Sequence, residues 1–93
     1  MKKLITAGAL AALLASSALA ADPESCATVR FSDVGWSDIT ATTAVATTIL
    51  EALGYETSID VLSVPVTYTS LSRGDIDVFL GNWMPTMESD IAP

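Results

Sequence analysis

Three side chains of the 93-residue sequence have types and spacings that suit the binding of a cation: Trp36, Asp38 and Trp83. Indole faces attract a permanently charged group such as trimethylammonium, which cannot donate conventional N–H hydrogen bonds. The carboxylate two residues beyond Trp36 would add a counter-charge. On residue types alone, both tryptophans could instead pack in the core or at its rim, and Asp38 could cap a helix.

The overall composition disfavours most other chemistry. The sequence has no His, which excludes histidine triads and the commonest zinc ligand, and its single Cys excludes an internal disulfide. We therefore expect neither a metal nor a cofactor. With 4 Lys and Arg against 11 Asp and Glu, it offers no basic surface, so nucleic acid is not an expected partner. Asp33, Asp75 and Asp77 are most simply loop or strand-edge carboxylates, and Asn82 a turn residue.

The elements that must position the three side chains alternate between strand and helix patterns. Strands are predicted over residues 28–32, 55–61 and 76–80, and helices over 39–53 and 66–72, with another helix beginning at Thr86. This alternation predicts an α/β fold: a partial parallel sheet with right-handed crossover helices.

The first predicted helix carries signals at both ends. Ser37 or Asp38 could cap its start, and Gly54 could end it. Its threonines are poor helix formers, so the helix should depend on packing an apolar stripe against the sheet. The predicted stripe consists of Ile39, Ala46, Ile49, Leu50 and Leu53.

Both tryptophans follow the carboxyl end of a predicted strand. In open α/β sheets, ligands bind in the crevice beyond these ends. Trp36 comes a few residues after the first strand, and Trp83 comes a few residues after the third. If those strands are neighbours, about 4.8 Å apart, the two indoles could face a common space beside Asp38. We call this expected arrangement the cation cage.

The N-terminal residues 1–20 have the pattern of a cleavable export signal. A basic start at Lys2 and Lys3 precedes an apolar stretch from Leu4 to Ala15, and a small-x-small ending leads to Ala20. The apolar stretch is shorter than the roughly 18 residues needed to span a membrane. The sequence therefore predicts an exported domain beginning near residue 21, in which Cys26 meets an oxidising compartment without a partner in this chain.

Four segments together resemble a known family. They are VRFSDVGWSDITAT, ILEALGY, LSVPVTYTSL and DIDVFLGNWMPTM. The motifs GWSDI and GNWMP, in this order after two strand signals, are similar to those of periplasmic choline-binding and glycine-betaine-type substrate-binding proteins of ABC transporters. The match is best for the choline-binding proteins, and this chain corresponds to about the first quarter of such a protein.

The resemblance implies a type II periplasmic binding protein fold, which closes two lobes on its ligand and presents it to a permease in the inner membrane. Residues 21–93 would be the incomplete N-terminal part of lobe 1. Trp36 and Trp83 would be two walls of the aromatic cage and Asp38 its acidic residue, while the other walls would lie beyond Pro93. Cys26 could pair with a cysteine in that missing part.

Choline is the favoured ligand over glycine betaine, carnitine or proline betaine. A betaine carboxylate needs extra donors, and Arg30 and Arg73 lie outside both cage motifs. As a fragment, the chain should be marginally stable and should not bind on its own, because two exposed cation–π contacts of about 0.5 to 1 kcal/mol each are too weak.

Two other functions compete with ligand capture. The first is an exported enzyme that acts on a small amine, with Asp38 or Asp77 as general base. The sequence shows no nucleophile, no set of metal ligands and no cofactor motif for such an enzyme, so no catalytic residue is predicted. A small secreted interaction protein is the other alternative, and a cooperative melt of the isolated chain would favour it.

Overall fold

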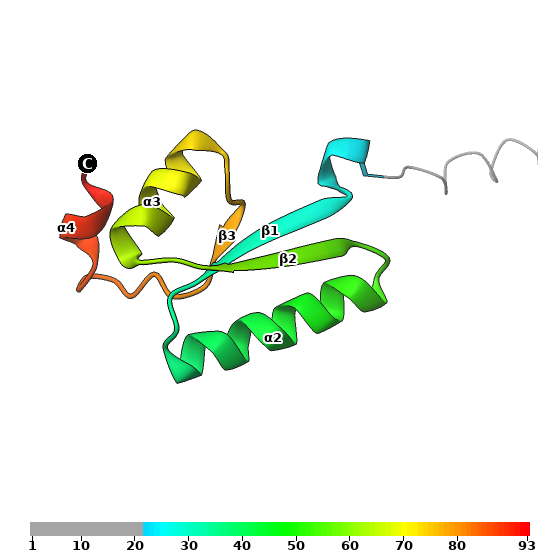
Figure 1. Ribbon diagram of the computed structural model, residues 1–93, viewed down its shortest axis with the longest axis horizontal. Coiled ribbons are helices and arrows are strands. Elements are labelled where there is room, and N and C mark those ends of the chain that lie inside the picture. The colour runs from blue at the N-terminus through cyan, green and yellow to red at the C-terminus, as the bar shows by residue number, and fades with distance from the viewer. Residues whose placement is uncertain (1–21) are drawn as a thin grey trace, which may run out of the picture.

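The computed structural model describes residues 22–93, so the predicted export signal at residues 1–20 lies outside the described part. The described elements are η2 (Glu24–Cys26), β1 (Thr28–Asp33), α2 (Ser37–Ala52), β2 (Glu56–Val61), α3 (Val64–Arg73), β3 (Val78–Phe79) and α4 (Glu88–Ile91). Their alternation along the chain confirms the α/β prediction (Figure 1). Within residues 22–93, the helices are all too short or too polar to cross a membrane.

The three strands form one parallel sheet in the order β2-β1-β3. The first strand pairs with β2 along its whole length, from Thr28 opposite Glu56 to Asp33 opposite Val61. On its other side it pairs with β3 only at Phe31 and Ser32. The first and third strands are therefore neighbours, as the cation cage requires. The third strand is shorter than the predicted 76–80, because only Val78 and Phe79 pair with β1.

Helices α2 and α3 cover opposite sides of this sheet (Figure 1). The alternation of side chains along β1 explains why both sides need a cover. Phe31 is buried, and its neighbour Ser32 is fully buried on the opposite face, where its hydroxyl lies 2.6 Å from that of Thr67 in α3. Helix α3 begins two residues before the predicted start, because Ser63 caps it and Pro65 is accepted in its first turn.

The predicted cap of the first helix is wrong. Helix α2 begins at Ser37 with Trp36 as its N-cap residue, and no side chain caps it there, so Ser37 and Asp38 lie within the first turn. The supporting carboxylate is Asp33, which accepts hydrogen bonds from the Gly35 amide (3.0 Å) and the Thr40 hydroxyl (2.6 Å). The left-handed backbone of Gly35, with φ of 82°, turns the chain from β1 into the helix.

The predicted apolar stripe of the first helix is partly wrong. Ile39 is buried as expected, but the next buried residues are Thr43 and Thr47, while Ile49 and Leu53 are exposed. Buried threonine is acceptable in a helix because its methyl group packs and its hydroxyl can bond to the preceding turn. The Thr47 hydroxyl donates to the carbonyl of Ala44 at 3.1 Å in this way.

Candidate functional site

The order of the strands creates a crevice between the carboxyl ends of β1 and β3. From β1 the chain crosses over to β2 on one side, whereas β3 lies on the other side of β1. The first and third strands therefore lie side by side with their carboxyl ends at one edge of the parallel sheet, and this edge is where open α/β sheets bind ligands. Trp36 is in the loop that leaves β1, and Trp83 is in the loop that leaves β3.

All three predicted site residues line one cavity of about 310 Å³ at this crevice. Trp36, Asp38 and Trp83 are joined there by Thr86 and Met87. The last two were missed from the sequence, although Met87 stands one helical turn beyond Trp83. A cavity of this size suits a small ligand, since it is at the lower end of the range for small-molecule sites.

Both indoles are partly open to solvent. Trp36 is 41% exposed and Trp83 is 55% exposed. Neither indole N–H donates a hydrogen bond to any residue in the range 22–93. Core packing therefore does not fully account for either tryptophan, and part of each residue remains accessible to a ligand.

The carboxylate of Asp38 is not committed to another partner. It accepts no hydrogen bond and forms no ion pair within the described residues; the Thr42 hydroxyl bonds only to the Asp38 backbone carbonyl. Its position in the first turn of α2 offsets the positive potential of that helix end, which would otherwise repel a cation.

The loop that carries Trp83 is held from two sides. The Trp83 amide donates to the thioether sulfur of Met87 (3.3 Å), and the Met87 amide donates to the Trp83 carbonyl (2.9 Å). The hydroxyl of Tyr68, from α3, donates to Oδ1 of Asn82 (2.7 Å) and lies 3.6 Å from the same sulfur. Asn82 is thus an anchor of the loop, a role beyond the turn residue suggested by its type. Burial, and to a lesser extent the charge of Asp90, raises the pKa of Tyr68 further above neutral pH.

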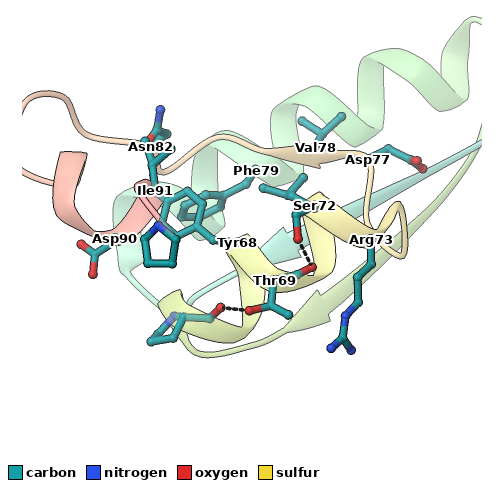
Figure 2. Close-up of a pocket in the computed structure, with 13 residues that line it drawn as sticks. Tyr68, Thr69, Ser72, Arg73, Asp77, Val78, Phe79, Asn82, Asp90 and Ile91 are labelled. Atoms are coloured by element: carbon teal, nitrogen blue, oxygen red, sulfur yellow. Dashed lines mark hydrogen bonds between the residues drawn. The ribbon is translucent and has the colours of Figure 1, made fainter.

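A larger cavity of about 940 Å³ lies between α3, β3 and the C-terminal segment. Figure 2 shows Tyr68 beside Phe79, and the C-terminal segment contributes Asp90 and Ile91 to the lining. The two rings pack edge to face, with centroids 5.7 Å apart, instead of facing a common space. Neither tryptophan lines this cavity, so it does not provide an aromatic cage.

Arg30 and Asp77 are engaged with each other, away from the crevice. The Arg30 guanidinium donates two hydrogen bonds to the Asp77 carboxylate (2.8 and 3.0 Å), and the Arg30 amide donates a third (2.8 Å). These bonds lower the pKa of Asp77 to about 2. A general base near neutral pH needs the opposite shift, so Asp77 is unsuited to the role considered in the enzyme alternative.

Within residues 22–93, no group of three or more His, Cys, Asp or Glu side chains could hold a metal ion. Cys26 is exposed and forms no disulfide in the part of the chain that the structure describes.

The sequence matches one protein family over residues 27–93, the OpuAC family, described as the substrate-binding domain of ABC-type glycine betaine transport systems. It is also similar to two solved structures of an ABC-transporter choline-binding protein. One, in complex with choline, is 85% identical over 77% of this chain, with a TM-score of 0.75. The other, in an unliganded semi-closed conformation, is 86% identical over 75% of this chain, with a TM-score of 0.69.

A protein of Chromohalobacter salexigens described as uncharacterized protein ORF1 is 50% identical over 88 residues, or 95% of this chain. The chain spans 55% of the length of that relative and about a quarter of the two solved chains, 25% and 24%. Its fold therefore matches one part of a longer binding protein.

Proposed function

Because the chain belongs to the OpuAC family of substrate-binding domains of ABC-type glycine betaine transport systems, we propose that it captures choline as part of an exported binding protein. Members of this family bind and deliver a substrate and are not enzymes. Their usual location outside the cytoplasm agrees with the export signal predicted at residues 1–20. The protein would present its ligand to a permease in the inner membrane.

The observation that carries this proposal is the convergence of two open indoles and one uncommitted carboxylate on a single small cavity. Trp36 and Trp83 would contact the trimethylammonium group through their faces, and Asp38 would supply the counter-charge. A permanent cation with no N–H donors is recognised best by such groups, because it gains little from hydrogen-bond acceptors.

Choline is favoured over glycine betaine because the cavity contains no cationic side chain. Arg30 is held by Asp77, and Arg73 lines the larger cavity instead. A betaine carboxylate near Asp38 would also be repelled. Glycine betaine remains the second candidate, since the family description names it.

Residues 21–93 would form an incomplete N-terminal lobe, and the remaining walls of the cage would come from later sequence. The indoles here are too exposed to hold a small ligand without a closing second lobe, since an exposed cation–π contact contributes only about 0.5 to 1 kcal/mol. We therefore expect no measurable choline binding by the isolated chain.

The proposal can be tested in a complete two-lobed protein. We define the chimera as the choline-binding protein of the solved structures with its matching segment replaced by residues 27–93 of this chain. Isothermal titration calorimetry should show saturable choline binding by the chimera. Glycine betaine should bind at least about tenfold more weakly, and so should 3,3-dimethylbutanol, the uncharged carbon analogue of choline. Equal affinity for the uncharged analogue would overturn the cation cage, and tighter binding of glycine betaine would assign the site to that ligand.

The loop that carries Trp83 also depends on the small size of Gly81. A Cβ atom at Gly81 would lie 2.7 Å from two ring carbons of Phe79 and 3.2 Å from Cγ1 of Ile39. The Phe79 ring cannot move freely, because it packs on Tyr68. We expect Gly81→Ala to destabilise the chimera by about 1 to 3 kcal/mol, as measured by urea unfolding.

The matched control for Gly81→Ala is the same change on a Phe79→Leu background. If the clash with the ring is the cause, Gly81→Ala should lower the free energy of unfolding clearly less on the Phe79→Leu background. The difference between the two losses is the coupling free energy between positions 79 and 81. An equal cost on both backgrounds would contradict the steric explanation.

A further inference from the structure

We propose that Met87 is a positioning residue for Trp83, acting through its thioether sulfur as well as its bulk. This inference rests on the proposed function, because it concerns how one wall of the cation cage is held. Met87 is the nearly buried member of the cavity lining, with 4% of its surface exposed. It therefore connects the open site to the interior of the domain.

The contacts between Met87 and Trp83 form a closed reciprocal pair. The Trp83 amide donates to the sulfur at 3.3 Å, and the Met87 amide donates to the Trp83 carbonyl at 2.9 Å. The pattern is similar to a capping box, in which a side chain reaches back to an amide while its own amide is bonded in return. Here a thioether takes the place of the usual carboxylate or carboxamide acceptor.

The sulfur is itself held in place by α3. The Tyr68 hydroxyl lies 3.6 Å from it while donating at 2.7 Å to Asn82, the residue before Trp83. Tyr68 thus supports two adjacent residues of the loop, directly at Asn82 and through the sulfur at Trp83. The Tyr68 hydroxyl is protonated at neutral pH, since an ordinary tyrosine has a pKa of about 10, so it can donate to either acceptor there.

Fixing the backbone of Trp83 matters because its indole is 55% exposed. An exposed side chain has few packing contacts to select one orientation, so the direction of the ring depends on where the backbone places its Cα–Cβ bond. A pre-organised ring reduces the entropy lost when a ligand binds. Met87 would in this way raise affinity without requiring a direct bond to the ligand.

The test compares three variants of the chimera. Met87→Leu removes the acceptor but keeps an apolar side chain of similar volume, Met87→Gln keeps an acceptor at similar reach, and Tyr68→Phe removes the hydroxyl alone. Choline affinity by calorimetry should fall about five- to tenfold in Met87→Leu, as expected for one lost hydrogen bond, and less than threefold in Met87→Gln. Tyr68→Phe should give an intermediate loss.

A readout without choline separates this inference from the proposed function. In the ligand-free chimera, Met87→Leu should speed hydrogen exchange of the Trp83 amide and increase the mobility of its indole in ¹⁵N relaxation, while the urea midpoint stays near that of the parent. If the chimera fails to bind choline yet shows these changes, the proposed function fails and the positioning role stands. Unchanged exchange and relaxation in Met87→Leu, or equal losses in the Leu and Gln variants, would overturn the positioning role.

Discussion

Replacing Trp83 by alanine in the chimera is expected to weaken choline binding about 30-fold or more. A desolvated cation–π contact contributes about 2 kcal/mol, and each 1.4 kcal/mol corresponds to a factor of ten in affinity. The indole is 55% exposed without ligand, so its removal should leave the free energy of unfolding nearly unchanged. Calorimetric titration with choline measures the first quantity, and urea unfolding measures the second.

Trp83→Phe is the control for this change. Phenylalanine keeps a smaller aromatic face at the same backbone position, so the affinity should lie between those of the parent and the alanine variant. If Trp83→Ala leaves the choline affinity unchanged, Trp83 is not part of the binding site. A loss of binding accompanied by a large loss of stability would mean that Trp83 supports the fold instead.

Replacing Asp38 by asparagine should weaken choline binding about tenfold and make the remaining affinity less dependent on ionic strength. A carboxylate a few ångströms from a cation near a protein surface gains between about 1 and 4 kcal/mol, and salt screens part of this attraction. The change leaves no hydrogen bond unmade within the described residues, because the Asp38 carboxylate has no partner there. The affinity measurement is repeated at low and high salt.

Asp60→Asn is the matched control for Asp38→Asn. Asp60 is an exposed carboxylate on β2 and does not line the cavity, so its removal lowers the net negative charge equally. It should change choline affinity by less than about twofold, as expected for a distant, screened charge. If both variants lose affinity to the same degree, the overall acidity of the protein is responsible and Asp38 has no special role.

The placement of Trp36 and Trp83 at one edge of the sheet could be predicted, because it depends only on where two strands end and on whether they are neighbours. Each tryptophan follows a strand signal by a short distance, and carboxyl ends of parallel strands meet at one edge of the sheet. The single condition left open was whether the first and third strands are neighbours, and the order β2-β1-β3 meets it. The resemblance to the family then named the same residues.

The supporting contacts could not be predicted, because they depend on packing in three dimensions. The pattern of helix α2 suggested that Ile49 and Leu53 would be buried, but the rotation of the helix buries Thr43 and Thr47. Asp33 supports the start of this helix through the Gly35 turn, a role that no residue spacing indicates. The role of Met87 similarly required knowing that its sulfur meets the Trp83 amide and the Tyr68 hydroxyl.

The most direct test of the cation cage is a crystal structure of the chimera with choline. The account predicts that the quaternary nitrogen lies within about 6 Å of the ring centroids of both Trp36 and Trp83, with the Asp38 carboxylate beside the trimethylammonium group. A structure in which choline binds elsewhere, or in which either indole points away from the ammonium group, would contradict it.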